Sequence, residues 1–173
     1  MGHRFEYQTS WASDEPAEAW GGNFPLVVVN IFEFAVDGYI VGARYFRVAD
    51  DLDSHVAGVF LELDNTLLGV SKFPTILEAS PVGWQHCYFR PRVPVLAGVL
   101  YAVGASFGGG YYGYTEDALT AGPIVTEDVT QIQDSGAHWN GAYGDGFALG
   151  GGWTHAAGTR FGVDCLFLRG DLT

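Results

Sequence analysis

The chain has 173 residues, 48% of them hydrophobic and 15% aromatic, so we expect one domain with a sizeable core. Its 20 acidic and 8 basic residues give a net charge of −12, which argues against nucleic-acid binding and against adsorption to an anionic membrane. The N-terminal sequence lacks the apolar segment of a signal peptide. The apolar run at 25–32 is too short to span a bilayer and is interrupted by Asn30.

Residues 1–24 differ in composition from the rest of the chain. They contain Trp11, Trp20 and an acidic stretch at 14–18. Two tryptophans in a polar segment indicate that the segment packs onto another surface. We therefore predict an N-terminal arm or lead-in over 1–24, which docks on a partner through Trp11 and Trp20, and a domain over 25–173.

From residue 25 onward the sequence predicts one strand after another, separated by turn signals. The expected strands cover 26–35, 39–48, 56–63, 67–73, 84–89, 93–96, 98–107 and 161–168. No run of ten or more residues has apolar side chains at helical spacing. About eight short strands predict an all-β fold, namely an antiparallel, jelly-roll-like β-sandwich.

A long region rich in glycine and tyrosine interrupts this pattern at 104–152, which holds 13 of the 25 glycines. Such a region is either a functional loop or a surface lid. Flat aromatic rings among glycines are suited to contact with a glycan or with a protein partner, and the alternative is that they cover the sandwich. The candidate contact residues are Tyr111, Tyr112, Tyr114, Trp139, Tyr143 and Trp153.

Three aspartates, Asp50, Asp51 and Asp53, cluster in one acidic loop. Calcium takes several oxygen ligands from loops of this kind, so a structural calcium site is one interpretation and solvated loop charges are the other. We expect no other cofactor. Cys87 and Cys165 each lie in an apolar, strand-like segment, which indicates two buried free thiols, with a disulfide between two strands as the alternative.

No combination of residues predicts catalysis. The segment 104–108 matches the pattern Gly-x-Ser-x-Gly, but further glycines follow it in place of the helix that a nucleophile elbow needs. No pair of carboxylates is set across a cleft by its sequence context. The sequence therefore predicts a protein that is not an enzyme.

Six segments carry a resemblance to a known family; they are 37–46, 56–60, 67–69, 83–93, 100–103 and 163–167. In this order, over roughly 27–168, they resemble a family of uncharacterised bacterial surface β-sandwich domains. Such domains occur beside cadherin-like and immunoglobulin-like modules in secreted proteins and also in actinobacterial phage proteins. The resemblance implies a jelly-roll-like sandwich with no catalytic residues.

A surface module of this kind, made in the cytoplasm without a signal peptide, fits a phage virion protein that is released by lysis. We therefore expect a structural protein of a phage particle, either a capsid decoration or a minor tail protein, located in the virion. Its expected partners are other virion proteins and copies of itself, with neither nucleic acid nor membrane among them. The alternative is a carbohydrate-binding module for cell-surface glycans.

Overall fold

The computed structural model describes residues 7–11, 15–22, 24–74, 81–133, 140–144 and 154–170, and all regular structure in these ranges is β-strand. The strands are β1 (Glu18–Trp20), β2 (Leu26–Phe34), β3 (Gly38–Arg47), β4 (Val56–Leu61), β5 (Leu67–Lys72), β6 (Gly83–Val95), β7 (Leu100–Phe107), β8 (Tyr112–Thr115), β9 (Ile124–Thr126), β10 (Val129–Gln131), β11 (Gly141–Gly144), β12 (Thr154–His155), β13 (Arg160–Phe161) and β14 (Val163–Arg169). Within the described ranges no helix is long and apolar enough to cross a bilayer.

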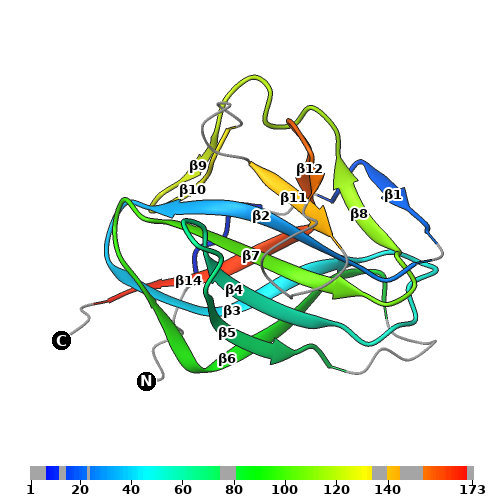
Figure 1. The fold of residues 1–173 in the computed structure, drawn as a ribbon, viewed down its shortest axis with the longest axis horizontal. Coiled ribbons are helices and arrows are strands. Elements are labelled where there is room, and N and C mark those ends of the chain that lie inside the picture. The colour runs from blue at the N-terminus through cyan, green and yellow to red at the C-terminus, as the bar shows by residue number, and fades with distance from the viewer. Residues whose placement is uncertain are drawn as a thin grey trace.

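The strands form an antiparallel β-sandwich, which confirms the predicted fold class (Figure 1). The larger sheet has the order β12-β11-β2-β7-β4-β5, with β10 beside β2 and β9 beside β10. The opposing sheet has the order β14-β3-β6, and a small third sheet has the order β1-β8-β13. The long strands correspond to those predicted, except that the two strands expected at 84–89 and 93–96 form the single strand β6. Short strands β8 to β11 lie where a long glycine- and tyrosine-rich loop region was expected.

Strand β2 shows why its sequence is almost continuously apolar. Val28, Phe32 and Phe34 face the main core between the two sheets. Val27 and Ile31 face the other side, where they belong to a second buried cluster. A strand that is buried on both faces has no polar alternation, as is usual for central strands.

The two cysteines lie on opposite sides of the central strand β3. Ala43 of β3 pairs with Cys165 of β14 on one side and with Cys87 of β6 on the other. Because neighbouring strands are about 4.8 Å apart, the two cysteine backbones are about 10 Å apart, which exceeds the reach of a disulfide, about 7 Å. The disulfide considered from the sequence is therefore excluded, and both cysteines are buried free thiols.

We expect both thiols to resist alkylation in the folded protein. Burial raises the pKa of the Cys87 thiol to about 11 and that of Cys165 well above its usual value, so neither forms the reactive thiolate at about pH 8. Intact-mass measurement after iodoacetamide treatment should show no adduct on the native protein and two adducts in denaturant. Rapid labelling of the native protein would contradict this burial.

Residues 7–11 run beside β14, the edge strand of the sheet β14-β3-β6. Gln8 exchanges two backbone hydrogen bonds with Phe167 of β14, each 2.9 Å long. Trp11 is 2% exposed, and its ring centroid lies 5.5 Å from that of Trp84. The prediction that Trp11 docks on a partner is therefore corrected, because its ring is part of the interior of this domain. The division at residue 24 into an arm and a sandwich stays a prediction.

Candidate functional site

The pairing of β1 with β8 gathers several aromatic side chains. In this antiparallel register Trp20 lies opposite Tyr112, and Glu18 lies opposite Tyr114. Directly opposed residues project from the same face, as do residues two apart on one strand. Trp20, Tyr112, Tyr114 and Glu18 therefore share one face. We call this group, together with the nearby Tyr143 of β11, the aromatic surface.

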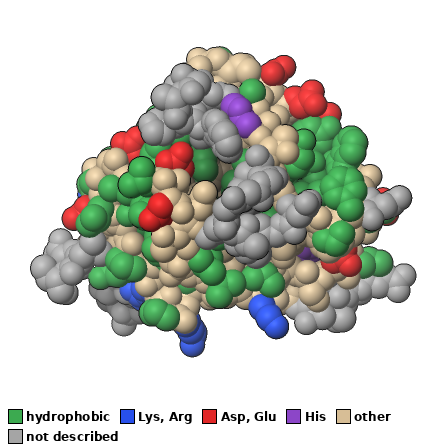
Figure 2. All heavy atoms as spheres, in the orientation of Figure 1, with side chains coloured by type: hydrophobic (Ala, Val, Ile, Leu, Met, Phe, Trp, Pro, Cys, Tyr) green, Lys and Arg blue, Asp and Glu red, His purple; other side chains and the backbone are tan. Residues whose placement is uncertain are grey.

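Buried rings hold the centre of the aromatic surface in place. Tyr112 contacts Phe161 with a centroid distance of 5.8 Å and Phe107 with one of 5.9 Å, and both phenylalanines are buried. Tyr114 lies next to Tyr112, with 6.0 Å between the ring centroids. Since Trp20 is 48% exposed, this fixed centre has a large accessible ring at its edge. Figure 2 shows hydrophobic side chains gathered over β1 and β8 at the upper right.

Polar groups complete the aromatic surface. The Tyr114 hydroxyl donates a hydrogen bond of 3.0 Å to the Glu18 carboxylate, and this bond raises the pKa of Tyr114. Burial raises the pKa of Tyr112 to about 12, with smaller contributions from Tyr114 and Tyr143. These phenols therefore stay protonated at neutral pH, where each can donate and accept hydrogen bonds. Rings and hydroxyls in this arrangement can contact both the apolar and the polar edges of a sugar.

The other predicted contact residues have different positions. The Tyr111 ring packs over Gly21, where a Cβ would lie 2.7 Å from the Cε1 atom of the ring, so Tyr111 holds the segment after β1 in place. Trp139 and Trp153 lie outside the described residues. Three of the six predicted contact residues, Tyr112, Tyr114 and Tyr143, thus contribute to the aromatic surface. Trp20, which was predicted to dock on a partner, lies with them.

The three aspartates of the acidic loop differ in burial and in their hydrogen-bond partners. Asp51 is buried, and its carboxylate lies 2.9 Å from Nε2 of His55. Asp53 accepts a hydrogen bond from the Gly109 backbone N–H, while Asp50 is exposed. In the described part of the chain no three His, Cys, Asp or Glu side chains are grouped so that they could hold a metal ion.

Ser106, His55 and Asp51 come close together, yet they do not form a nucleophilic triad. Nδ1 of His55 lies 2.6 Å from the backbone carbonyl oxygen of Ser106, not from its hydroxyl. The Ser106 hydroxyl oxygen instead accepts a hydrogen bond from the Val56 N–H. His55 and Asp51 are both 1% exposed, so a substrate cannot reach them. This geometry joins the acidic loop to β7 and activates no nucleophile.

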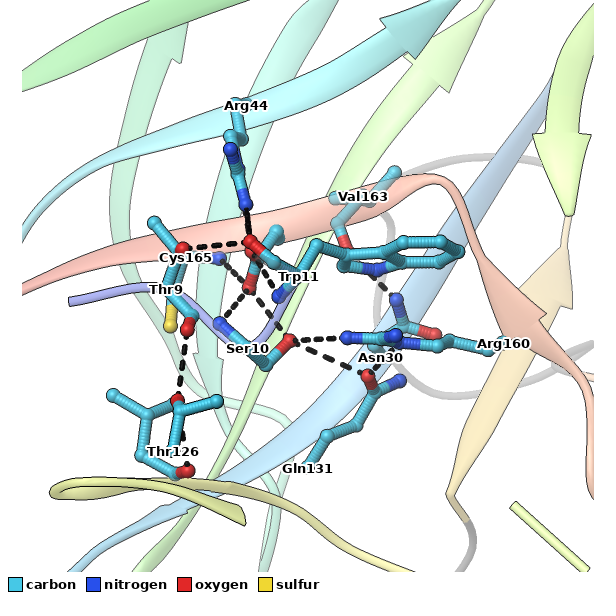
Figure 3. A network of polar contacts seen from close by, with 12 residues as sticks. Thr9, Ser10, Trp11, Asn30, Arg44, Thr126, Gln131, Arg160, Val163 and Cys165 are labelled. Carbon is cyan, nitrogen blue, oxygen red and sulfur yellow. Dashed lines mark hydrogen bonds and ion pairs between the residues drawn. The ribbon is translucent and has the colours of Figure 1, made fainter. Parts of the chain in front are cut away.

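A buried polar network that the sequence analysis missed anchors residues 7–11 (Figure 3). The Asp164 carboxylate, which is fully buried, accepts hydrogen bonds from the backbone N–H groups of Ser10, Trp11 and Cys165. It also accepts a hydrogen bond from the Ser10 hydroxyl at 2.8 Å and forms an ion pair with Arg44 at 2.9 Å. Every oxygen lone pair that burial removes from water is thereby satisfied. A single aspartate inside the apolar strand 163–168 was the signal that could have revealed a buried charge pair.

A second arginine closes the network on the opposite side. The Arg160 guanidinium lies 3.7 Å from the centre of the Trp11 ring, a cation–π contact. It also donates hydrogen bonds to the side-chain amide oxygen of Gln131 at 2.7 Å and to the Ser10 hydroxyl at 3.1 Å. In Figure 3, Ser10 and Trp11 lie between the side chains of Arg44 and Arg160. The network therefore has a structural role, because it holds the N-terminal segment on the sheet.

A family model described as Domain of unknown function (DUF4082) matches residues 27–154. The chain belongs to this family. Membership of a family of uncharacterised β domains, expected from the resemblance, is thus confirmed, while an origin in a phage remains a prediction. No curated protein matches this DUF4082 chain.

Comparison with solved structures gives matches at low sequence identity, of which the first has a TM-score above 0.5. A structure of the clostridial cysteine protease Cwp84 after propeptide cleavage is 9% identical, with a TM-score of 0.54, over 95% of this chain and 40% of that chain. The DUF4082 chain thus spans less than half of that protein's length. A second structure, of the cysteine protease and lectin-like domains of Cwp84 from Clostridium difficile, has a TM-score of 0.45 at 8% identity over 84% of this chain and 32% of that chain. The C-terminal CBM6 of LamC from Zobellia galactanivorans has a TM-score of 0.22 at 18% identity over 56% of this chain and 61% of that chain.

Proposed function

We propose that this domain is a non-catalytic carbohydrate-binding module that holds a sugar against the aromatic surface of β1, β8 and β11. The observation that carries the proposal is the β1–β8 register, which places Trp20, Tyr112 and Tyr114 on one face. Glu18 on the same face supplies a carboxylate that can accept hydrogen bonds from sugar hydroxyls.

The physical basis is the amphipathic character of both partners. A sugar ring has an apolar face of C–H groups and a rim of hydroxyls, and a tryptophan or tyrosine ring presents a flat apolar face with a polar edge. Rigid aromatic side chains lose little conformational entropy on binding, so stacking on them gives a net gain. Since Phe107 and Phe161 hold the Tyr112 ring, part of this ordering is already complete before the ligand arrives.

The comparison with Cwp84 agrees with this proposal. That protein is described as surface-layer associated and as having lectin-like domains. At 9% identity, the likeness to Cwp84 supports the shared fold alone.

A structural role in a phage particle, together with a location in the virion, remains a prediction from the resemblance. Of the two tryptophans that were assigned to docking on a virion, Trp11 is buried. Trp20 belongs to the aromatic surface, where a sugar ring is a suitable partner. These positions favour glycan binding over virion docking through residues 1–24.

Replacing Trp20 with alanine should weaken glycan binding about tenfold, because an accessible stacking ring is lost. The measurement is affinity electrophoresis in gels that contain soluble neutral polysaccharides, namely a β-glucan, a xylan and a galactomannan. The melting temperature of the Trp20→Ala variant should match that of the unchanged protein, since Trp20 is 48% exposed. Leu63→Ala is the matched control, because Leu63 is 86% exposed and lies outside the aromatic surface. Equal mobility of Trp20→Ala and the unchanged protein in every gel would overturn the proposal.

A further inference from the structure

Within the described ranges, the exposed lysine and arginine side chains that form no ion pair lie on two neighbouring strands. Arg44, Arg47 and Arg160 are buried, and Arg169 forms an ion pair with Asp128 at 2.6 Å. The other basic residues within the described ranges are exposed, and they are Lys72 of β5 and Arg90 and Arg92 of β6. Figure 2 shows the basic side chains of this view mainly along the lower edge, where Figure 1 has β5 and β6. An anion that approaches the molecule is attracted there and repelled elsewhere.

A bulge in β6 creates a pocket at the two arginines. In the pairing of β3 with β6, Ile40 lies opposite Val93 and Gly42 lies opposite Tyr88, so residues 89–92 face Val41 alone. The extra residues of β6 have to bend away from the sheet. The resulting pocket has a volume of about 490 Å³, and its lining includes Tyr7, Tyr88, Arg90 and Arg92. This volume lies in the usual range of small-molecule sites, about 300–1,000 Å³.

Two tyrosines form an aromatic wall of this pocket. The ring centroids of Tyr7 and Tyr88 lie 6.1 Å apart, and the rings are 38% and 50% exposed. Tyr7 is held by the neighbouring pair Gln8–Phe167. The Tyr88 ring lies over Gly42, where a Cβ would be 3.2 Å from its Cδ1 atom and would collide with the Cys87 carbonyl oxygen, so glycine is needed at this position. Both rings are therefore positioned by the fold before any ligand binds.

The arginines are available to a ligand. In the described part of the chain neither Arg90 nor Arg92 forms an ion pair or a side-chain hydrogen bond, and no acidic residue lines the pocket. A guanidinium group binds a carboxylate through two parallel N–H···O bonds, which a lone ammonium group cannot do. Aromatic rings beside two guanidinium groups match the chemistry of a sugar ring that bears a carboxylate.

We propose that the pocket formed by Tyr7, Tyr88, Arg90 and Arg92 binds an acidic sugar of a polysaccharide, with its carboxylate on the arginines and its ring against the tyrosines. This site is separate from the aromatic surface and does not depend on it. A carboxylated sugar is favoured over an anionic membrane, because two tyrosine rings lie beside the arginines in this pocket and can stack on a sugar ring.

The experiment is isothermal titration calorimetry with oligogalacturonate and, in parallel, with its methyl ester, which has the same sugar backbone without the charge. Oligogalacturonate should bind, the methyl ester should bind at least about tenfold more weakly, and high salt should weaken the binding of oligogalacturonate. Arg90→Gln and Arg92→Gln should each reduce affinity about tenfold, since each removes a charge-assisted hydrogen-bond pair. Tyr88→Ala should reduce it about fivefold, while Tyr88→Phe keeps the ring and should bind nearly as well as the unchanged protein.

Lys72→Gln is the matched control, because it removes the same charge from the adjacent strand and does not line the pocket. Equal losses for Lys72→Gln and Arg90→Gln would overturn the site, since they would indicate attraction by net charge alone. No binding of oligogalacturonate, equal binding of the ester, or a preference for vesicles containing phosphatidylglycerol would also overturn it. Trp20→Ala should leave oligogalacturonate binding unchanged, so that failure of this site and failure of the aromatic surface are distinguishable.

Discussion

Replacing Asp164 with alanine should lower the free energy of unfolding by about 3–5 kcal/mol, the range observed when one partner of a buried ion pair is removed. The carboxylate is fully buried, and its loss would leave the Arg44 charge without its partner. The backbone N–H groups of Ser10 and Trp11 would also lose their acceptor. Urea unfolding followed by tryptophan fluorescence measures this loss.

The matched control is Asp50→Ala, which changes the net charge by the same amount at an exposed position. Its effect should stay within about 0.5 kcal/mol. Since the network holds residues 7–11 on the sheet, Asp164→Ala should also be cleaved by chymotrypsin after Tyr7 or Trp11 faster than the control. A loss below about 1 kcal/mol without faster cleavage would contradict the structural role of the network.

Replacing Asn30 with alanine should lower the free energy of unfolding by about 3 kcal/mol, because several buried backbone groups would lose their partners together. Asn30 lies in the inward-facing row of β2, between Val28 and Phe32. Its side-chain amide donates to the carbonyl oxygens of Phe161 and Val163 at 2.8 and 2.6 Å, and its carbonyl oxygen accepts from the Phe161 N–H at 3.1 Å. These bonds connect the large sheet with the β13–β14 corner.

Gln133→Ala serves as the control for Asn30→Ala. The exposed Gln133 amide donates one hydrogen bond, 2.9 Å long, to the Thr120 carbonyl oxygen, and water can replace it there. Guanidinium denaturation of both variants should therefore give a small loss for Gln133→Ala and a large one for Asn30→Ala. Similar losses in the two variants would show that the inter-sheet bonds of Asn30 add little to stability.

The position of Tyr7 connects the Asp164 network with binding at the arginine pocket. Tyr7 directly precedes Gln8, which pairs with Phe167, and the Asp164 network begins at Ser10. A variant that releases residues 7–11 should therefore also weaken the pocket at Arg90 and Arg92. This dependence runs in one direction, because the pocket variants Arg90→Gln and Arg92→Gln lie on the exposed face of β6 and remove no contact of the network.

Local patterns in the sequence were sufficient for the fold class. Strand-length runs of β-branched and aromatic residues, separated by turn signals, predicted an antiparallel sandwich and the long strands β2, β3 and β7 close to their observed bounds. These patterns indicate which residues are buried, because successive side chains of a strand point to opposite faces of the sheet. The same patterns marked Asn30 as a break in an apolar run, but they did not identify its partners.

Only the tertiary structure decided how the candidate sites are assembled. Ser10 and Asp164, which are 154 residues apart, meet because Gln8 pairs with β14. Trp20 joins Tyr112 because β1 pairs with β8 in one register, and a shift by one residue would place the two rings on opposite faces. Arg90 and Arg92 line a pocket because β6 bulges against Val41. Strand register and bulges depend on contacts between distant segments, so the chain by itself determined its layers, and the folded structure determined which side chains act together.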